Sequence, residues 1–173
     1  MAFLQTMTTH DEEDALALEA AIGLACRFHQ GQRDKSGVAY ILHPLTLLVQ
    51  SSDPLVQQAA VLHDVLEDTP ATEQDLIDAG VQPAAIEAVK LLTHQPSDSY
   101  AEYVVRLKCN ATARSAKLLD LHDNYRLNRV ALRESNAVED AQRLQKYILT
   151  KQFLSDEMDE TEYRRRMRTV EIA

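Results

Sequence analysis

The chain has 173 residues, 45% of them apolar and 26% charged, which is the composition of a single globular domain with a sizeable core. Its formal net charge of −9 argues against nucleic acid and anionic membranes as partners, so an anionic ligand would need a local basic pocket or a metal ion. The longest mostly apolar run, residues 15–26, is too short to cross a bilayer and contains Glu19, which favours a buried helix.

The cysteines and the N-terminus predict a cytoplasmic protein. Cys26 and Cys109 lack the spacing of metal-binding cysteines, which favours a reducing compartment. The first residues do not combine a basic start with a long apolar segment, so we expect no signal peptide.

Helix signals follow one another along the chain, and no segment alternates convincingly with the period of two that marks a strand. A threonine at position 8 or 9 can cap a first helix with an acidic early turn. Asp53 and Pro54 form a cap and a first-turn proline, and Thr72 with Asp75 resembles a capping box. The sequence therefore predicts an all-α fold, a compact helical bundle, with helices at about residues 9–30, from 44, 53–69, 72–80, 83–95, 100–110, 111–129 and 136–155.

The C-terminal part is expected to pack on the rest of the chain. The helix at 136–155 is amphipathic, and Ala141, Leu144, Ile148 and Phe153 form the face expected to point inward. We therefore expect one domain, residues 1–173, with the helices of 136–173 packed against the remainder.

Two adjacent residues, His63 and Asp64, are the most informative in the chain. They lie in an apolar stretch, residues 59–69, with the pattern of a core helix, where a charged pair is costly to bury unless it is compensated. His43 and Asp120 are two further candidates of the same character. Two imidazoles and two carboxylates suit Mn, Fe, Co or Zn better than Ca or a thiolate-binding metal. The sequence therefore predicts a site for one divalent metal ion.

A second polar layer follows these candidate ligands. Glu67 and Asp68 each come four residues after a candidate ligand of the same predicted helix, and Asn124 follows Asp120 in the same way. Residues four apart lie one turn apart on one helix face. This layout is expected if one layer binds a metal and the next handles protons. The plain alternative for Glu67 and Asp68 is a solvated helix end.

Five short motifs resemble, in combination, the HD-domain metal-dependent phosphohydrolases. Among these they are most similar to the Rel/SpoT-type domains, which remove the 3′-pyrophosphate from the alarmones ppGpp and pppGpp. The resemblance covers about residues 15–130. The motifs are KSG at 35–37, YILHP at 40–44, LHDVLEDT at 62–69, TxxDL at 72–76, and KLxD at 117–120 with an asparagine at 124.

The resemblance implies an all-helical hydrolase with one metal ion, usually manganese, held by the four candidate ligands. Glu67 and Asp68 match the acidic pair that positions or deprotonates the attacking water. Asn124, Lys35 and Arg126 match positions that contact the substrate in the family, and Arg33 is expected to add positive charge there on the basis of its residue type. The plain alternatives are loop charges for Arg33 and Lys35 and an ion pair with Asp123 for Arg126.

Two departures from the family pattern leave base recognition open. Asp34 stands where the family often has an arginine before the lysine, and Leu127 stands where it often has a threonine. The substrate could therefore be another nucleotide or phosphate ester, or the domain could be a catalytically silent nucleotide sensor. The chain also lacks the synthetase domain of the long bifunctional enzymes, so we expect no alarmone synthesis.

Overall fold

The computed structural model describes residues 9–125 and 137–171, and regular structure within them is helical. In these two ranges the β-type pairing is one isolated bridge between Arg33 and Ala39, so the predicted all-α fold is confirmed. None of the described helices is both long and apolar enough to span a membrane. The helices are α1 (Thr9–Phe28), α2 (Leu42–Leu48), α3 (Pro54–Leu62), α4 (Val65–Asp68), α5 (Glu73–Ala79), α6 (Pro83–Leu92), α7 (Tyr100–Lys108), α8 (Ala111–Asn124), α9 (Ala137–Leu154) and α10 (Glu160–Glu171).

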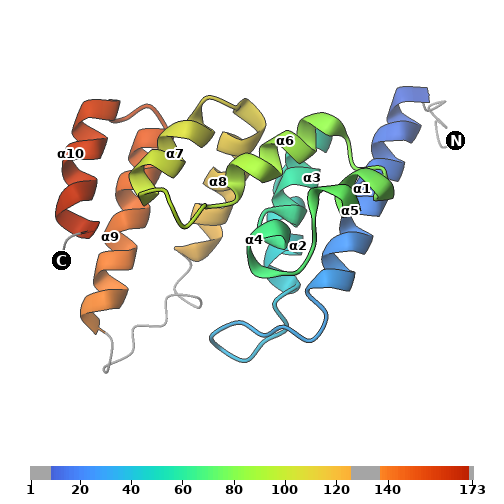
Figure 1. Ribbon diagram of the computed structural model, residues 1–173, viewed down its shortest axis with the longest axis horizontal. Coiled ribbons are helices and arrows are strands. Elements are labelled where there is room, and N and C mark those ends of the chain that lie inside the picture. The colour runs from blue at the N-terminus through green and yellow to red at the C-terminus, as the bar shows by residue number, and fades with distance from the viewer. Residues whose placement is uncertain (1–8, 126–136, 172–173) are drawn as a thin grey trace, which may run out of the picture.

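Figure 1 shows two groups of helices that meet at α8. The helices α1 to α6 lie on the right of the view, and α7, α9 and α10 lie on the left. The short helix α3 is central to the larger group because it packs against α1, α2, α6 and α8. Ala59 and Ala60 of α3 are fully buried, and their small side chains let the neighbouring helices approach closely. His63 and Val65, in the segment that follows α3, are therefore buried in the interior of the molecule.

The caps expected at Asp53 and at Thr72 with Asp75 are present, whereas Thr8 lies outside the described residues and Thr9 is the first residue of α1. Asp53 accepts hydrogen bonds from two backbone N–H groups of α3, Thr72 and Asp75 form a reciprocal capping box on α5, and Asn110 accepts from a backbone N–H of α8. Each cap satisfies donors that a helix start leaves without a partner. They fix where α3 and α8 begin, and hence which residues of these helices face each other.

The predicted helix at 53–69 is interrupted where the metal-binding motif lies. The structure has α3 ending at Leu62 and α4 starting at Val65, with His63 and Asp64 in the turn between them. His63 Nδ1 lies 2.8 Å from the carbonyl oxygen of Ala60, the acceptor that the Asp64 N–H would use in a continuous helix. The histidine side chain thus takes over a backbone acceptor, and the prediction of one unbroken helix is wrong.

The face of α9 that points inward also differs from the prediction. Ala141 and Ile148 are exposed, while Asp140 and Thr150 are buried together with Phe153. The two polar groups tolerate burial because each has a partner: Asp140 pairs with an arginine one turn on, and the Thr150 hydroxyl donates to a backbone carbonyl one turn back. Only Phe153 of the expected apolar face is fully buried.

Candidate functional site

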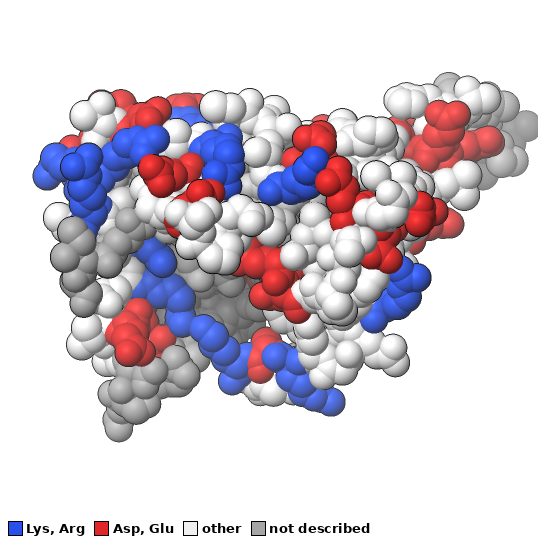
Figure 2. Space-filling model, viewed as in Figure 1, with Lys and Arg blue, Asp and Glu red and all other residues white. Residues whose placement is uncertain are grey.

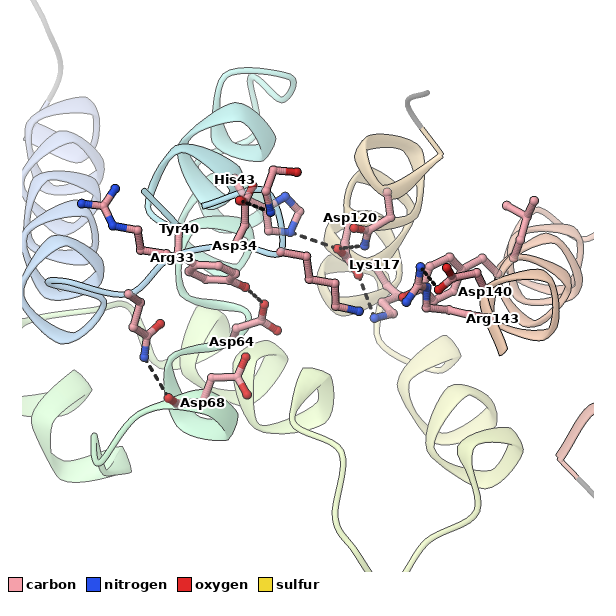
Figure 3. Close-up of a pocket in the computed structure, with 16 residues that line it drawn as sticks. Arg33, Asp34, Tyr40, His43, Asp64, Asp68, Lys117, Asp120, Asp140 and Arg143 are labelled. Carbon is pink, nitrogen blue, oxygen red and sulfur yellow. Dashed lines mark hydrogen bonds and ion pairs between the residues drawn. The ribbon is translucent and has the colours of Figure 1, made fainter. Parts of the chain in front are cut away.

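A cavity of about 620 Å³ lies between the loop before α2, the turn at α4, and the helices α8 and α9. Figure 3 shows that side chains from all of these elements point into it. It is lined by Gln32, Arg33, Asp34, Lys35, Ser36, Tyr40, His43, Asp64, Asp68, Lys117, Asp120, Asn124, Asp140, Arg143, Leu144 and Tyr147.

Three candidate ligands meet at the inner wall of this cavity. His43 comes from α2, His63 from the end of α3 and Asp120 from α8, and one potential ligand atom of each lies within 4.8 Å of the others. Asp120 Oδ1 is 3.2 Å from His43 Nε2 and 3.8 Å from His63 Nε2. All three residues are buried. This is a donor set that a divalent ion of the first transition row or zinc accepts.

The two imidazoles are oriented for metal binding. His43 Nδ1 lies 2.8 Å from the carboxylate of Asp123, and His63 Nδ1 lies 2.8 Å from the carbonyl of Ala60. Both partners can only accept, so both Nδ1 atoms carry a proton and both Nε2 atoms are left for the space near Asp120. His63 Nε2 is buried and lies 2.9 Å from Asp64 Oδ2 and 3.8 Å from Asp120 Oδ1, so it faces the two carboxylates that could share an ion with it.

Asp64 stands beside the cluster of three. Its Oδ2 is 2.9 Å from His63 Nε2 and accepts a hydrogen bond from the hydroxyl of Tyr40. Burial disfavours ionisation of Asp64, but the neighbouring His63 outweighs it and lowers the pKa of this carboxyl to about 2. Burial also opposes the charged form of His63, yet Asp64 and then Asp120 raise its pKa to about 9. The pair is therefore ionised at neutral pH when no ion is bound.

Asp120 is held from two sides. Lys117 Nζ donates to its Oδ2 at 2.8 Å and Asn124 Nδ2 donates to its Oδ1 at 2.6 Å. Burial opposes ionisation, but the Lys117 ammonium keeps the pKa of Asp120 well below its usual range, and Asp120 in turn keeps the pKa of Lys117 well above its own. Asp120 thus stays a carboxylate and can ligate a cation.

The charges of this region match a divalent ion. Three carboxylates, from Asp64, Asp120 and Asp123, lie around the two histidines, and the Lys117 ammonium pairs with Asp120. With neutral imidazoles, Asp64 and Asp120 carry two negative charges against the one positive charge of Lys117, in a largely buried place. Such an excess is costly unless a cation neutralises it, so the residues present fit a divalent metal ion.

The structure separates the two members of the acidic pair. Asp68 lines the cavity, and its pKa is raised by partial burial and by the nearby Asp64 carboxylate. Glu67 is exposed and is not among the described residues that line the cavity. Its carboxylate instead accepts a hydrogen bond from the backbone N–H of His94 at 2.8 Å. Asp68 is therefore the member of the pair that faces the cavity.

The predicted substrate-binding residues that the structure describes all line the cavity. Arg33, Lys35 and Asn124 line it, and Arg33 also donates to the carbonyl of Gly37 at 3.1 Å. Arg126 lies outside the described residues, as does Leu127. Figure 2 shows basic side chains running along the hollow on this face, with acidic side chains on both sides. The acidic protein thus presents local positive charge where an anionic ligand would enter.

Sequence reasoning missed several residues of the site. Tyr40 lies in the YILHP motif but carried no assigned role, and Asp123 was considered only as a partner for Arg126. The wall formed by α9 was missed altogether. Arg143 and Tyr147 line the cavity there, four residues apart on one helix face, and this spacing is the one signal that pointed to them.

Comparison with known proteins confirms the resemblance that the motifs indicated. The chain is 42% identical over 77 residues to the bifunctional (p)ppGpp synthase/hydrolase SpoT of Escherichia coli K12, which is 42% of this chain and 11% of that protein. It is 44% identical over 63 residues to a GTP pyrophosphokinase of Streptomyces coelicolor, which is 34% of this chain and 7% of that protein. The matched part thus spans about a tenth of the length of these relatives. No family model matches the chain.

A solved structure shares the fold. It is described as a metazoan ortholog of SpoT that hydrolyzes ppGpp, and it superimposes with a TM-score of 0.59 and 24% sequence identity. The match covers 78% of this chain and 84% of the other. The helical arrangement therefore extends over most of both chains, well beyond the segments matched in sequence.

Proposed function

We propose that the protein is a metal-dependent phosphohydrolase that removes the 3′-pyrophosphate of the guanosine alarmones ppGpp and pppGpp. The observation that carries this proposal is the buried cluster of His43, His63 and Asp120 at the wall of a cavity with basic side chains at its mouth. The similarity to SpoT and the shared fold with a SpoT ortholog support the choice of substrate.

The ion would be held by His43, His63, Asp64 and Asp120, with manganese the first candidate and Fe, Co or Zn as alternatives. A divalent ion held there would lower the pKa of the water it carries and screen the charge that builds on phosphate oxygens. Asp64 belongs to this set because its Oδ2 lies 2.9 Å from His63 Nε2 and Tyr40 holds it in place. The excess of negative charge at Asp64 and Asp120 over Lys117 supports a bound cation at this place.

The acidic pair would handle the protons. Asp68 faces the cavity, and its raised pKa makes its carboxylate a better proton acceptor than an ordinary aspartate. Water attacks the phosphorus next to the ribose, its proton passes to the pair, and the departing 3′ oxygen takes up a proton. The exposed Glu67 side chain would join by exchanging its bond with the His94 N–H for one with the water.

Substrate phosphates and ribose would be held by Arg33, Lys35, Asn124 and Arg126. Asp34 is not assigned to the base, because its carboxylate accepts hydrogen bonds from the N–H groups of Ser36 and Val38, at 2.9 and 3.0 Å, and shapes the loop instead. Recognition of guanine must therefore be tested against other bases.

We further propose that residues 1–173 act as one domain in the cytoplasm, with a small nucleotide as partner and neither nucleic acid nor membrane. The contacts of α9 with α8 and of α10 with α7 support a single unit. The net charge of −9 supports the exclusion of polyanionic partners.

The test is hydrolysis of ppGpp by the purified protein with added Mn²⁺, beside a panel of other nucleotides. Release of pyrophosphate from ppGpp that is lost in Asp64→Ala is the expected result. Glu67→Gln should keep the metal and lose most of the turnover; normal turnover would remove Glu67 from the acid–base pair. Turnover of a different nucleotide alone would keep the reaction class and discard the substrate, and full activity of Asp64→Ala would overturn the metal-dependent mechanism.

A further inference from the structure

Asp123 has a buried carboxylate. In the proposed reaction this carboxylate is neither a metal ligand nor a proton acceptor. It lies on α8 three residues after Asp120, so both side chains project from the same face of the helix toward α2. Only 2% of Asp123 is exposed. A carboxylate buried to this degree must be compensated by its contacts, which makes its partner informative.

One partner is the imidazole of His43. One turn of α8 holds both nitrogens of this ring: Asp123 Oδ2 lies 2.8 Å from Nδ1, and Asp120 Oδ1 lies 3.2 Å from Nε2. Since an ionised carboxylate only accepts, the proton of the neutral ring sits on Nδ1. The lone pair of Nε2 is then directed toward the place where Asp120 and His63 meet.

We propose that Asp123 is a positioning residue of the metal centre, which fixes the tautomer and direction of His43 and strengthens it as a ligand. The inference rests on the metal site of the proposed function. A carboxylate behind a ligating histidine makes the imidazole a stronger electron donor, and its loss typically weakens metal binding about 10–100-fold.

The second histidine shows that this support is specific to one ligand. His63 Nδ1 donates to the carbonyl of Ala60, a neutral acceptor that sets the ring orientation without adding a charge. Asp123 therefore makes His43 the more strongly donating of the two imidazoles. A substitution that removes the charge but keeps the shape of Asp123 isolates this contribution.

The experiment compares Co²⁺ binding by the metal-stripped full chain with that of Asp123→Asn. Co²⁺ is followed by its visible absorption, which also reports the coordination geometry. We expect the dissociation constant of the variant to rise about 10–100-fold. Asp140→Asn is the matched control, because Asp140 is buried to the same 2% in the same region but pairs with Arg143 of α9. Its Co²⁺ affinity should equal that of the wild type.

The outcomes separate the inference from the proposed function. Wild-type protein that binds no Co²⁺ would overturn the metal site itself. Wild-type binding with an unchanged dissociation constant in Asp123→Asn would overturn only the role of Asp123, and a lower melting temperature without a loss of affinity would show that the residue supports the fold alone.

A second measurement is made on the wild type and does not need the Asp123→Asn variant to fold. In the Zn²⁺-loaded wild type, ¹H–¹⁵N correlation of the histidine rings should show His43 protonated at Nδ1 and metal-bound at Nε2. The signal is assigned by its loss in His43→Gln. A ring protonated at Nε2 would contradict the proposal.

Discussion

Lys117 gives the most direct test of the charge balance at the candidate metal centre. Its ammonium pairs with Asp120 at 2.8 Å, and only 14% and 7% of the two side chains are exposed. Lys117→Met keeps most of the side-chain length but leaves Asp120 without this cation. Removing one partner of a buried pair costs about 3–5 kcal/mol. In the metal-free protein, a loss of 3 kcal/mol would lower the melting temperature by roughly 6–12 °C for a chain of this size.

A divalent ion should offset most of this loss because it supplies the missing positive charge next to Asp120. By linkage, the metal must then bind Lys117→Met more tightly than it binds the wild type. The gain in binding free energy equals the extra stabilisation that the metal gives the variant. The assay is urea unfolding followed by circular dichroism, in chelator and in excess Mn²⁺. Lys90→Met is the control, since Lys90 forms only surface pairs with Glu73 and Glu87 and should respond little in either condition. An equal loss for Lys117→Met with and without Mn²⁺ would refute the reasoning.

Three further predictions follow from the site and the fold. Burial lowers the pKa of His63, but Asp64 and Asp120 outweigh burial and raise it from 6.5 to about 9. The contribution of His63 to the stability of the metal-free protein should therefore be complete below pH 6.5 and be lost as the pH rises through 9. Mn²⁺ binding needs the neutral ring and should tighten by up to about tenfold per pH unit between 7 and 9 in competition titrations; a flat profile would contradict this. Tyr40→Phe removes the hydrogen bond to the Asp64 carboxylate and should lower the metal-free free energy of unfolding by about 1.5–3 kcal/mol, measured by denaturant titration. Thr72→Ala removes a cap on α5 and should cost about 1 kcal/mol while leaving Mn²⁺ affinity unchanged, and altered affinity would show unexpected coupling to the site.

The metal side of the cavity was predictable because its chemistry restricts residue types. His43, His63 and Asp120 are far apart in sequence, and the structure brings them to one place. Histidine and aspartate are costly to bury within apolar helices unless they pair or bind an ion. Their pattern was therefore visible in the sequence before any packing was known. The caps at Asp53 and Thr72 were predictable for the related reason that a helix start needs a local acceptor.

The break after α3 was not predictable from helix propensity. Residues 59–69 favour a continuous helix, and the interruption depends on the His63 ring donating to the Ala60 carbonyl. That bond forms because packing holds the ring in place, and packing is not encoded in a local window. After this interruption, Asp68 lines the cavity while Glu67 bonds to the backbone of His94. An ideal continuous helix would have given the two residues equivalent positions, and the structure does not.

The wall formed by α9 was hidden for a different reason. A search for apolar periodicity treats Asp140, Arg143 and Tyr147 as solvent-facing, because buried polar residues are uncommon unless they are paired. Here Asp140 and Arg143 pair with each other at 2.9 Å, and the pair together with Tyr147 turns the polar face of α9 into a wall of the cavity. The candidate metal ligands and the wall formed by α9 therefore come from different parts of the chain. The ligands lie in short motifs on α2, after α3 and on α8, whereas the wall depends on a helix whose place at the cavity is set only when the chain is packed.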